Sequence, residues 1–452
     1  MDEKNTLFKR KIEYEIANWQ KSLSLKKKAL VIKGLRQIGK TSIVKKYAYE
    51  HYENVIYIDF KKELRLKKIF EEDLSVNSIL QNLSAYKPGI VFIPYKTVLI
   101  FDEIQECSGA RASIKYFMED GQYDVIATGS LLGIEGYNNK YTGGVPVGFE
   151  HIVHMKSMDF EEFLWAKGIS YDITNYLSEC YQNKAEIKET IHNEMFKLFK
   201  EYLCVGGMPA VVNTFIKTYN YNVVRQEQKD ILESYKDDFG KYINKKGEED
   251  IDKTMLARIT NVFENIPSQL AKENKKFAYS YIEHKGTSAK YDPAIRWLVE
   301  YGVINYCYNL RCLEDPLEGN KIDNIFKLYV SDSGLFISML DDDTIPQILS
   351  DNLNIYKGAI YENIIADALS KNNKKLYYYS KNTLEIDFII KHNNVISLVE
   401  VKARNGNAKS AKTIINNKEK YPEVNKIIKL GIFNIKQNNQ ILNIPLYLAY
   451  LL

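Results

Sequence analysis

One phosphate-binding motif constrains the fold of this 452-residue chain more than any other feature. Residues 34–41 read Gly-Leu-Arg-Gln-Ile-Gly-Lys-Thr and satisfy every fixed position of G-x-x-x-x-G-K-[ST]. An apolar run from Ala29 to Ile32 precedes the motif, and a helix-forming segment follows it. In such a strand–loop–helix context, glycines let backbone N–H groups surround phosphates, and the helix N-terminus adds its positive dipole end.

The motif predicts which residues bind a nucleotide. They are Gly34, Arg36, Gln37, Ile38, Gly39, Lys40, Thr41 and Ser42. We expect Lys40 to reach the β- and γ-phosphates and the Thr41 hydroxyl to bind magnesium. ATP and Mg²⁺ are therefore the predicted cofactors.

Acidic and hydroxyl residues end two later strands of the same region. The apolar run Val98–Phe101 ends in Asp102 and Glu103. Because the carboxyl end of a parallel strand lies beside the phosphate crevice, we expect Asp102 to hold Mg²⁺ through water and Glu103 to orient or activate the attacking water. Segment 123–130 ends in Ala-Thr-Gly-Ser, and we prefer Ser130 to Thr128 as a contact for the γ-phosphate or the water. A turn-forming hydroxyl is the alternative for Ser130.

Strand-like and helical segments alternate along the first third of the chain. The strand candidates cover 29–32, 54–60, 97–104 and 123–130. Such alternation predicts an α/β fold with a doubly wound parallel sheet. We expect a P-loop core over 1–168, a helical lid or linker over 169–250, a winged-helix-like region over 251–349 and a C-terminal α/β domain over 350–452.

These motifs resemble the AAA family of P-loop ATPases, and in particular one prokaryotic subgroup with a C-terminal domain of unknown function. The resemblance rests on GLRQIGKTSIV, LIFDEIQEC and ATGSLLGI, and continues through YLCVGGMPAVV, KLYVSDSGLF, GAIYENIIADAL, EIDFII and VEVKA. It implies ATP binding and hydrolysis, with Lys40, Glu103 and Ser130 as catalytic candidates, and a homo-oligomer as a candidate assembly. Arg111 and Arg225 are candidates for an arginine finger, although either also suits a salt bridge.

A second group of carboxylates lies in the C-terminal region. Glu362 falls on a helical segment, Asp387 in EIDFII, and Glu400 and Lys402 in VEVKA. Alternation along a strand places Glu400 and Lys402 on one face. This pattern resembles the PD-(D/E)xK nuclease fold, which implies Glu362, Asp387 and Glu400 as metal ligands and Lys402 as a catalytic lysine. An inactive binding module with the same fold is the alternative.

The winged-helix-like region suggests double-stranded DNA as a partner. Ser288, Lys290 and Arg296 flank a helix suited to a major groove, and the lysines of 272–276 suit phosphate contacts. A protein-interaction module is the alternative interpretation.

Composition excludes several classes of protein. The net charge is only +4, so any basic surface must be local. The five cysteines are scattered without a CxxC pair, which argues against a zinc site or a disulfide framework. No apolar run approaches the roughly 18 residues of a membrane span, and the N-terminus lacks a signal-like apolar segment. We expect a cytoplasmic protein with no membrane partner.

The pattern as a whole predicts an ATPase that couples nucleotide state to a C-terminal nuclease-like module acting on DNA. Two alternatives remain. One is a regulatory or signalling ATPase that switches protein partners through an inactive C-terminal domain. The other is a nucleotide-gated DNA binder in which Glu103 is idle.

Overall fold

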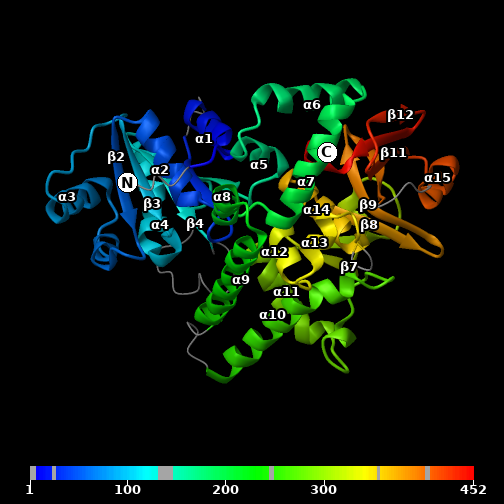
Figure 1. The fold of residues 1–452 in the computed structure, drawn as a ribbon. Coiled ribbons are helices and arrows are strands. Elements are labelled where there is room, and N and C mark those ends of the chain that lie inside the picture. The colour runs from blue at the N-terminus through cyan, green and yellow to red at the C-terminus, as the bar shows by residue number, and fades with distance from the viewer. Residues whose placement is uncertain (1–6, 23–26, 131–145, 244–248, 354–356, 403–407) are drawn as a thin grey trace. The chain divides into compact units, whose positions relative to one another are not determined.

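The computed structural model describes residues 7–22, 27–130, 146–243, 249–353, 357–402 and 408–452 (Figure 1). Residues 131–134, which belong to the ATGSLLGI phrase, lie outside this described part. The chain divides into two compact units, Met1–Ser157 and Met158–Leu452. The predicted fold class is confirmed: a parallel P-loop sheet is followed by a helical region and a C-terminal α/β region. The finer domain boundaries stay predictions.

In the described part of the first unit, five strands form one parallel sheet. Its order is β2-β3-β4-β1-β5. The strands are β1 (Ala29–Lys33), β2 (Asn54–Asp59), β3 (Thr97–Asp102), β4 (Asp124–Gly129) and β5 (Glu150–His154). The helices are α1 (Ile12–Lys21), α2 (Lys40–His51), α3 (Val76–Tyr86) and α4 (Ser108–Asp120), with 3-10 turns η1 (Leu64–Phe70) and η2 (Ile104–Glu106).

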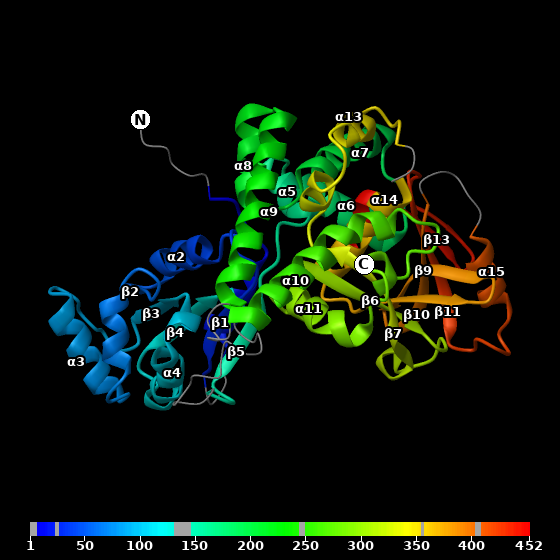
Figure 2. The same cartoon turned by 90° about the horizontal axis from the view of Figure 1, so that it is seen from below.

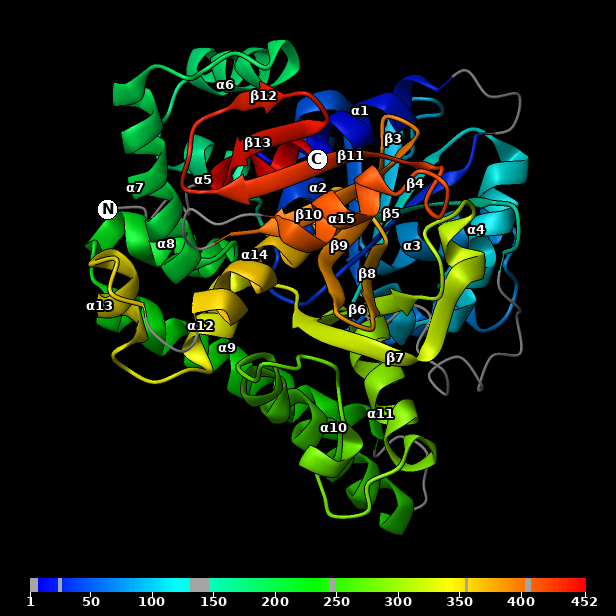
Figure 3. The same cartoon turned by 90° about the vertical axis from the view of Figure 1, so that its right-hand side faces the viewer.

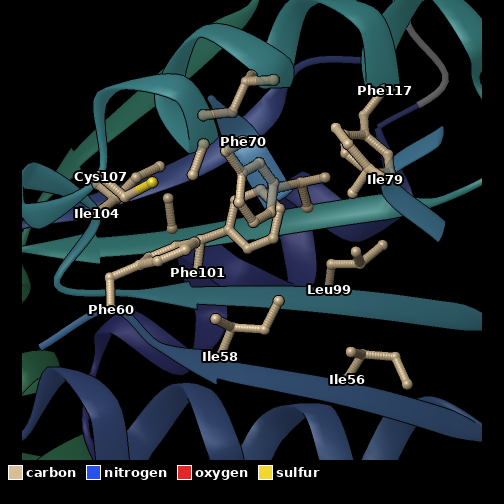
Figure 4. Packing of buried hydrophobic residues seen from close by; sticks show 14 of the residues in the cluster. Ile56, Ile58, Phe60, Phe70, Ile79, Leu99, Phe101, Ile104, Cys107 and Phe117 are labelled. Carbon is tan, nitrogen blue, oxygen red and sulfur yellow. The ribbon is translucent and has the colours of Figure 1, made fainter. Parts of the chain in front are cut away.

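Alternation along the strands gives this sheet two different faces. On one face, Ile56, Ile58 and Phe60 from β2 and its exit join Leu99 and Phe101 from β3 in a buried apolar cluster (Figure 4). The rings of Phe60, Phe70 and Phe101 pack edge to face, with centroids 5.4 to 5.7 Å apart. Because successive side chains point to opposite faces, Tyr57 and Asp102 lie on the other side of the sheet. There the ring of Tyr57 meets Lys45 of α2.

The second unit begins with a helical region, which Figures 1 and 2 show in green. Its helices are α5 (Phe160–Ala166), α6 (Tyr171–Asn183), α7 (Glu189–Val205), α8 (Pro209–Thr218), α9 (Tyr221–Ile243), α10 (Glu249–Leu270) and α11 (Ser288–Tyr301), with the 3-10 turn η4 (Tyr279–Tyr281). The second unit has further helices among its later strands. They are α12 (Ser333–Ser338), α13 (Thr344–Leu349), α14 (Lys357–Lys371) and α15 (Lys409–Asn416), with the 3-10 turns η5 (Leu317–Asn320) and η6 (Leu446–Leu451).

A mixed sheet of eight strands forms the rest of the described second unit (Figure 3). Its strands, in spatial order, are β12 (Lys436–Asn438), β13 (Ile441–Pro445), β11 (Val424–Gly431), β10 (Val395–Val401), β9 (Leu384–His392), β8 (Leu376–Lys381), β6 (Ile304–Leu310) and β7 (Lys321–Val330). The β6–β7 hairpin follows α10 and α11 in the chain. Because β6 pairs in parallel with β8, this hairpin and the C-terminal strands share one sheet.

Two further observations bear on the predicted class of protein. No helix in the described ranges combines the length and apolar character that crossing a membrane requires. All five cysteines are free, and four of them are buried.

Candidate functional site

The phosphate-binding loop connects β1 to α2. Gly39 has a φ of 90°, in the left-handed region that favours glycine. A Cβ on Gly34 would lie 2.3 Å from the carbonyl oxygen of Met155, so a side chain there would displace the backbone. Two of the motif's fixed positions therefore require glycine for reasons visible in the fold.

The ammonium of Lys40 lies inside this loop. Its Nζ donates to the carbonyl oxygens of Gly34 at 2.9 Å and Leu35 at 2.6 Å. Burial lowers the pKa of Lys40 to about 8, although the nearby carboxylates of Glu103 and Asp102 act in the opposite direction. The loop thus holds a buried cation that a triphosphate would stabilise.

The carboxylate of Asp102 is the centre of a hydroxyl network. Thr41 Oγ1 lies 2.9 Å from Oδ1 and 3.1 Å from Oδ2 of Asp102. The hydroxyls of Tyr57, at 2.7 Å, and of Thr128 also donate to it. Hydroxyl and carboxylate oxygens are the ligands that Mg²⁺ prefers, so this donor set fits the predicted metal. Thr41 and Asp102 would hold it.

Glu103 stands at the end of β3 in a strained backbone conformation. Its φ is 51°, which is uncommon for a residue with a side chain. The side chain is half-buried, and Gln105 Nε2 donates to its Oε2. The hydrogen bond from Gln105 holds the carboxylate in place, as a residue that positions water requires.

The two hydroxyls at the end of β4 differ in what they contact. Thr128 donates to Asp102, whereas the buried Oγ of Ser130 has no hydrogen-bond partner in the described part of the chain. The sequence prediction preferred Ser130 for a contact with the γ-phosphate or water, and that assignment stays a prediction. The contact between Thr128 and Asp102 was not predicted.

The remaining predicted nucleotide contacts differ in exposure. Gln37 and Ser42 are exposed, Arg36 is half-buried and the side chain of Ile38 is fully buried. The side chain of Ile38 is therefore a packing group, and only its backbone can serve a phosphate.

A residue that sequence reasoning missed supports the loop from outside the motif. Arg10 is 5% exposed, and its guanidinium donates to the carbonyl oxygens of Ile38 at 3.0 Å and Lys156 at 2.7 Å. Because the Ile38 carbonyl belongs to the phosphate-binding loop, Arg10 stabilises the loop conformation. No local pattern around Arg10 signals this role.

Both arginine-finger candidates are engaged in ion pairs. Arg111 makes a two-pronged contact with Glu150, at 3.0 and 3.1 Å. Arg225 lies 2.9 Å from Asp342 and donates to the carbonyl oxygen of Leu340 at 2.5 Å. Both contacts support the salt-bridge interpretation.

The predicted C-terminal site is a cluster of carboxylates paired with lysines. Oε1 of Glu362, on α14, accepts a hydrogen bond from Lys275. Its Oε2 accepts a hydrogen bond from Tyr329 at 3.2 Å and lies 3.8 Å from the Lys327 ammonium. Glu400 lies 2.5 Å from Lys402. Although burial raises the pKa of Glu362, Lys327 and Lys275 outweigh it, so the pKa is lowered.

Asp387 is the least compensated member of this cluster. Its Oδ2 accepts the Val401 N–H at 2.7 Å, but no lysine lies in direct contact with it among the described residues. Burial, together with Glu362 and Glu400, raises the pKa of Asp387 to about 7, despite the opposing charge of Lys327. Within the described residues, no three Asp, Glu, His or Cys side chains converge as a metal site would require. With both oxygens of Glu362 engaged, this arrangement does not fit the predicted three-ligand metal site.

The residues predicted to contact DNA are only partly available. Lys275 pairs with Glu362, and Lys272 lies over the ring of Tyr281. Lys290 pairs with Glu283 at 2.5 Å. Lys276, Ser288 and Arg296 are exposed. The predicted phosphate-binding role of 272–276 therefore rests on few exposed lysines. The net charge of the chain is also small, so it adds little general attraction for DNA.

Comparison with known families places three domains along the chain. Residues 26–164 match an AAA domain, AAA_14; residues 196–345 match a domain of unknown function, DUF8612; and residues 357–448 match another, DUF4143. No curated protein matches the chain.

Three solved structures show limited similarity. The ORC2 protein of Aeropyrum pernix, in ADPNP-ADP complexes, is 12% identical with a TM-score of 0.38, covering 75% of this chain and 92% of that one. The RuvB Holliday junction branch migration motor of Thermotoga maritima is 13% identical with a TM-score of 0.29, covering 66% and 89%. Protein VC1899 of Vibrio cholerae is 8% identical with a TM-score of 0.16, covering 93% and 95%.

Because these TM-scores are low, the assignment of the first unit rests on the family match and on the geometry around Lys40, Thr41 and Asp102. Residues 26–164 match the AAA domain family, and this match supports a P-loop ATPase domain of that type.

Proposed function

We propose that the first unit hydrolyses ATP with Mg²⁺ and that its nucleotide state controls the second unit. The observation that carries this proposal is the hydrogen bond between Thr41 and Asp102, which joins the phosphate loop to the acidic strand end. Lys40 directly precedes Thr41 in the chain, and Glu103 directly follows Asp102. The cation, the metal-binding pair and the base therefore belong to one site.

Each residue has a separate task in this proposal. Lys40 neutralises phosphate charge once it turns from the carbonyls of Gly34 and Leu35. Glu103, held by Gln105, orients the attacking water and accepts its proton. Mg²⁺, when bound by Thr41 and by Asp102 through water, supplies charge stabilisation at the phosphates. Ser130 is the nearby hydroxyl left to contact the γ-phosphate or that water.

Steady-state phosphate release tests this hydrolytic role. The parent protein should release phosphate from ATP in a Mg²⁺-dependent manner, and Lys40→Ala should not. Phosphate release at the buffer rate by a parent that still binds ATP would favour a nucleotide-gated binder instead.

For the second unit, the nuclease-like proposal assigns Asp387 and Glu400 to metal and Lys402 to the water or the phosphate. Double-stranded DNA would be its substrate, and a cytoplasmic homo-oligomer the working form. Support comes from β9 and β10, which are adjacent antiparallel strands that carry Asp387 and Glu400.

A specific observation favours the second candidate, a regulatory ATPase with an inactive C-terminal domain. The carboxylates of Glu362 and Glu400 already have lysine partners, so the cluster is charge-compensated by the chain itself. A divalent cation would have to displace lysine from Glu362.

Supercoiled plasmid distinguishes the two candidates. The full chain is incubated with plasmid and Mg²⁺ or Mn²⁺, with and without ATP, beside Lys402→Ala and Lys409→Ala, a lysine on α15 as the matched control. Nicking that Lys402→Ala alone abolishes supports the nuclease. Intact plasmid under all conditions supports the regulatory ATPase.

A further inference from the structure

Tyr57, on β2, contacts Asp102 and Lys45 of α2 and has no role in the predicted site. Tyr57 Oη donates to Asp102 Oδ2 at 2.7 Å, from a neighbouring strand and 45 residues away in sequence. The registers Tyr57↔Ile100 and Asp59↔Asp102 place the tyrosine two pairs before the strand ends. Side-chain alternation puts Tyr57 on the same face of the sheet as Asp59 and Asp102.

The single proton of the phenol is directed to Asp102. The other carboxylate in reach, Asp59, lies farther away, at 3.4 Å. Asp59 Oδ1 is already supplied by the backbone N–H groups of Lys61 at 3.0 Å and Lys62 at 3.1 Å. Burial, followed by the hydrogen bond to Asp102, raises the pKa of Tyr57, so the phenol remains a donor at neutral pH.

The ring of Tyr57 is itself held in place. Lys45 Nζ from α2 lies 3.3 Å from the ring centroid, on the helix that begins with Lys40 and Thr41. A cation over the ring is attracted to its π face. The tyrosine is therefore fixed between the helix that supplies Thr41 and the strand that supplies Asp102.

Tyr57 and Thr41 donate to the same carboxylate, but only Thr41 is also a predicted metal ligand. Thr41 would turn its hydroxyl to Mg²⁺, which leaves Asp102 with one donor fewer. Tyr57 lies on a strand and keeps its contact with Oδ2. Together with Thr128, which donates to Oδ1, it limits the rotation of the carboxylate that would hold the metal-bound water. Outer partners of this kind typically change metal affinity about 10- to 100-fold.

We propose that Tyr57 is a positioning residue that orients Asp102 for Mg²⁺. This inference rests on the proposed function, because it concerns the metal at the same site. The expected defect of a Tyr57 variant is specific. Its affinity for nucleotide without metal is unchanged, and the increase in affinity that Mg²⁺ causes is lost.

The test measures binding of a fluorescent ADP to the full chain in EDTA and in Mg²⁺, for the parent, Tyr57→Phe and Tyr52→Phe. Tyr52 is the matched control because its hydroxyl donates to Asp124 Oδ2 at 2.6 Å, at the start of β4 and away from the strand ends that form the site. Tyr57→Phe should retain its affinity in EDTA and lose about 10-fold of the affinity in Mg²⁺. Tyr52→Phe should match the parent in both.

The outcomes separate the two proposals. An equal loss of affinity for Tyr57→Phe in EDTA and in Mg²⁺ would mean that the tyrosine only packs against α2, and would overturn the inference. An unchanged Mg²⁺ gain would overturn it as well. A parent chain that binds no ADP, or gains nothing from Mg²⁺, would instead refute the proposed function.

Discussion

The hydroxyl of Thr41 lies 2.9 Å from the carboxylate of Asp102, although 61 residues separate them in the chain. This contact joins the first turn of α2 to the end of β3. It brings the two residues predicted to hold Mg²⁺ into direct contact through the parallel pairing of β1, β4 and β3.

Replacing Lys40 by Ala should abolish ATP hydrolysis and weaken nucleotide binding. The β- and γ-phosphates lose their cation, and the carbonyl oxygens of Gly34 and Leu35 lose their shared donor. Phosphate release and equilibrium binding measure the two effects. Lys46→Ala, a surface lysine of the same helix that pairs with Glu13, serves as the control. Parental turnover in Lys40→Ala would remove the phosphate-loop assignment.

Replacing Glu103 by Gln should trap ATP on the protein. Thr41 and Asp102 are untouched, so the metal remains held while the water loses its base. Retention of radiolabelled ATP through a desalting column measures the trap. If this variant hydrolyses ATP as fast as the parent, another group must be the base.

Nucleotide affinity should fall as the pH rises above about 8, the value to which burial lowers the pKa of Lys40. Phosphates favour the protonated lysine, so binding at higher pH must be accompanied by proton uptake, and affinity should fall by up to about tenfold per pH unit. Calorimetry in two buffers of different ionisation enthalpy measures the uptake. Lys40→Arg, which stays charged over this range, should bind with no such dependence. A parental affinity that is flat between pH 7 and 9.5 would contradict the prediction.

Replacing Asp387 by Asn should stabilise the protein at neutral and alkaline pH. The pKa of Asp387 in the folded chain, about 7, exceeds the ordinary value of 3.8. Its protonated form therefore contributes stability that is fully present below pH 3.8 and is lost as the pH rises through about 7. Asn retains an oxygen for the Val401 N–H and carries no charge, so the variant should melt several degrees above the parent at pH 8 and nearer to it at pH 5.

Thermal melts across this pH range, without added metal, measure the difference. Asp323→Asn on β7 is the control, because its carboxylate is 82% exposed. A constant difference between Asp387→Asn and the parent at every pH would show that Asp387 does not titrate in this range.

The sequence by itself determined the nucleotide-binding loop and the order of strands and helices around it. Residues 34–41 are contiguous, so their spacing alone dictates the turn, the glycines and the helix start. The parallel sheet followed from alternating apolar and helical segments, because each strand needs a crossover before it can pair in parallel.

Tertiary structure decided the contacts between distant side chains. Nothing in a chain with 34 tyrosines distinguishes Tyr57 until the register of β2 with β3 brings it to Asp102. Likewise, the motif Asp387–Glu400–Lys402 was visible, but Lys275 comes to Glu362 from 87 residues away. Residue type and local spacing determine what a side chain can do. Strand register and packing determine which partner it has, and whether a carboxylate is free for a metal or already paired with lysine.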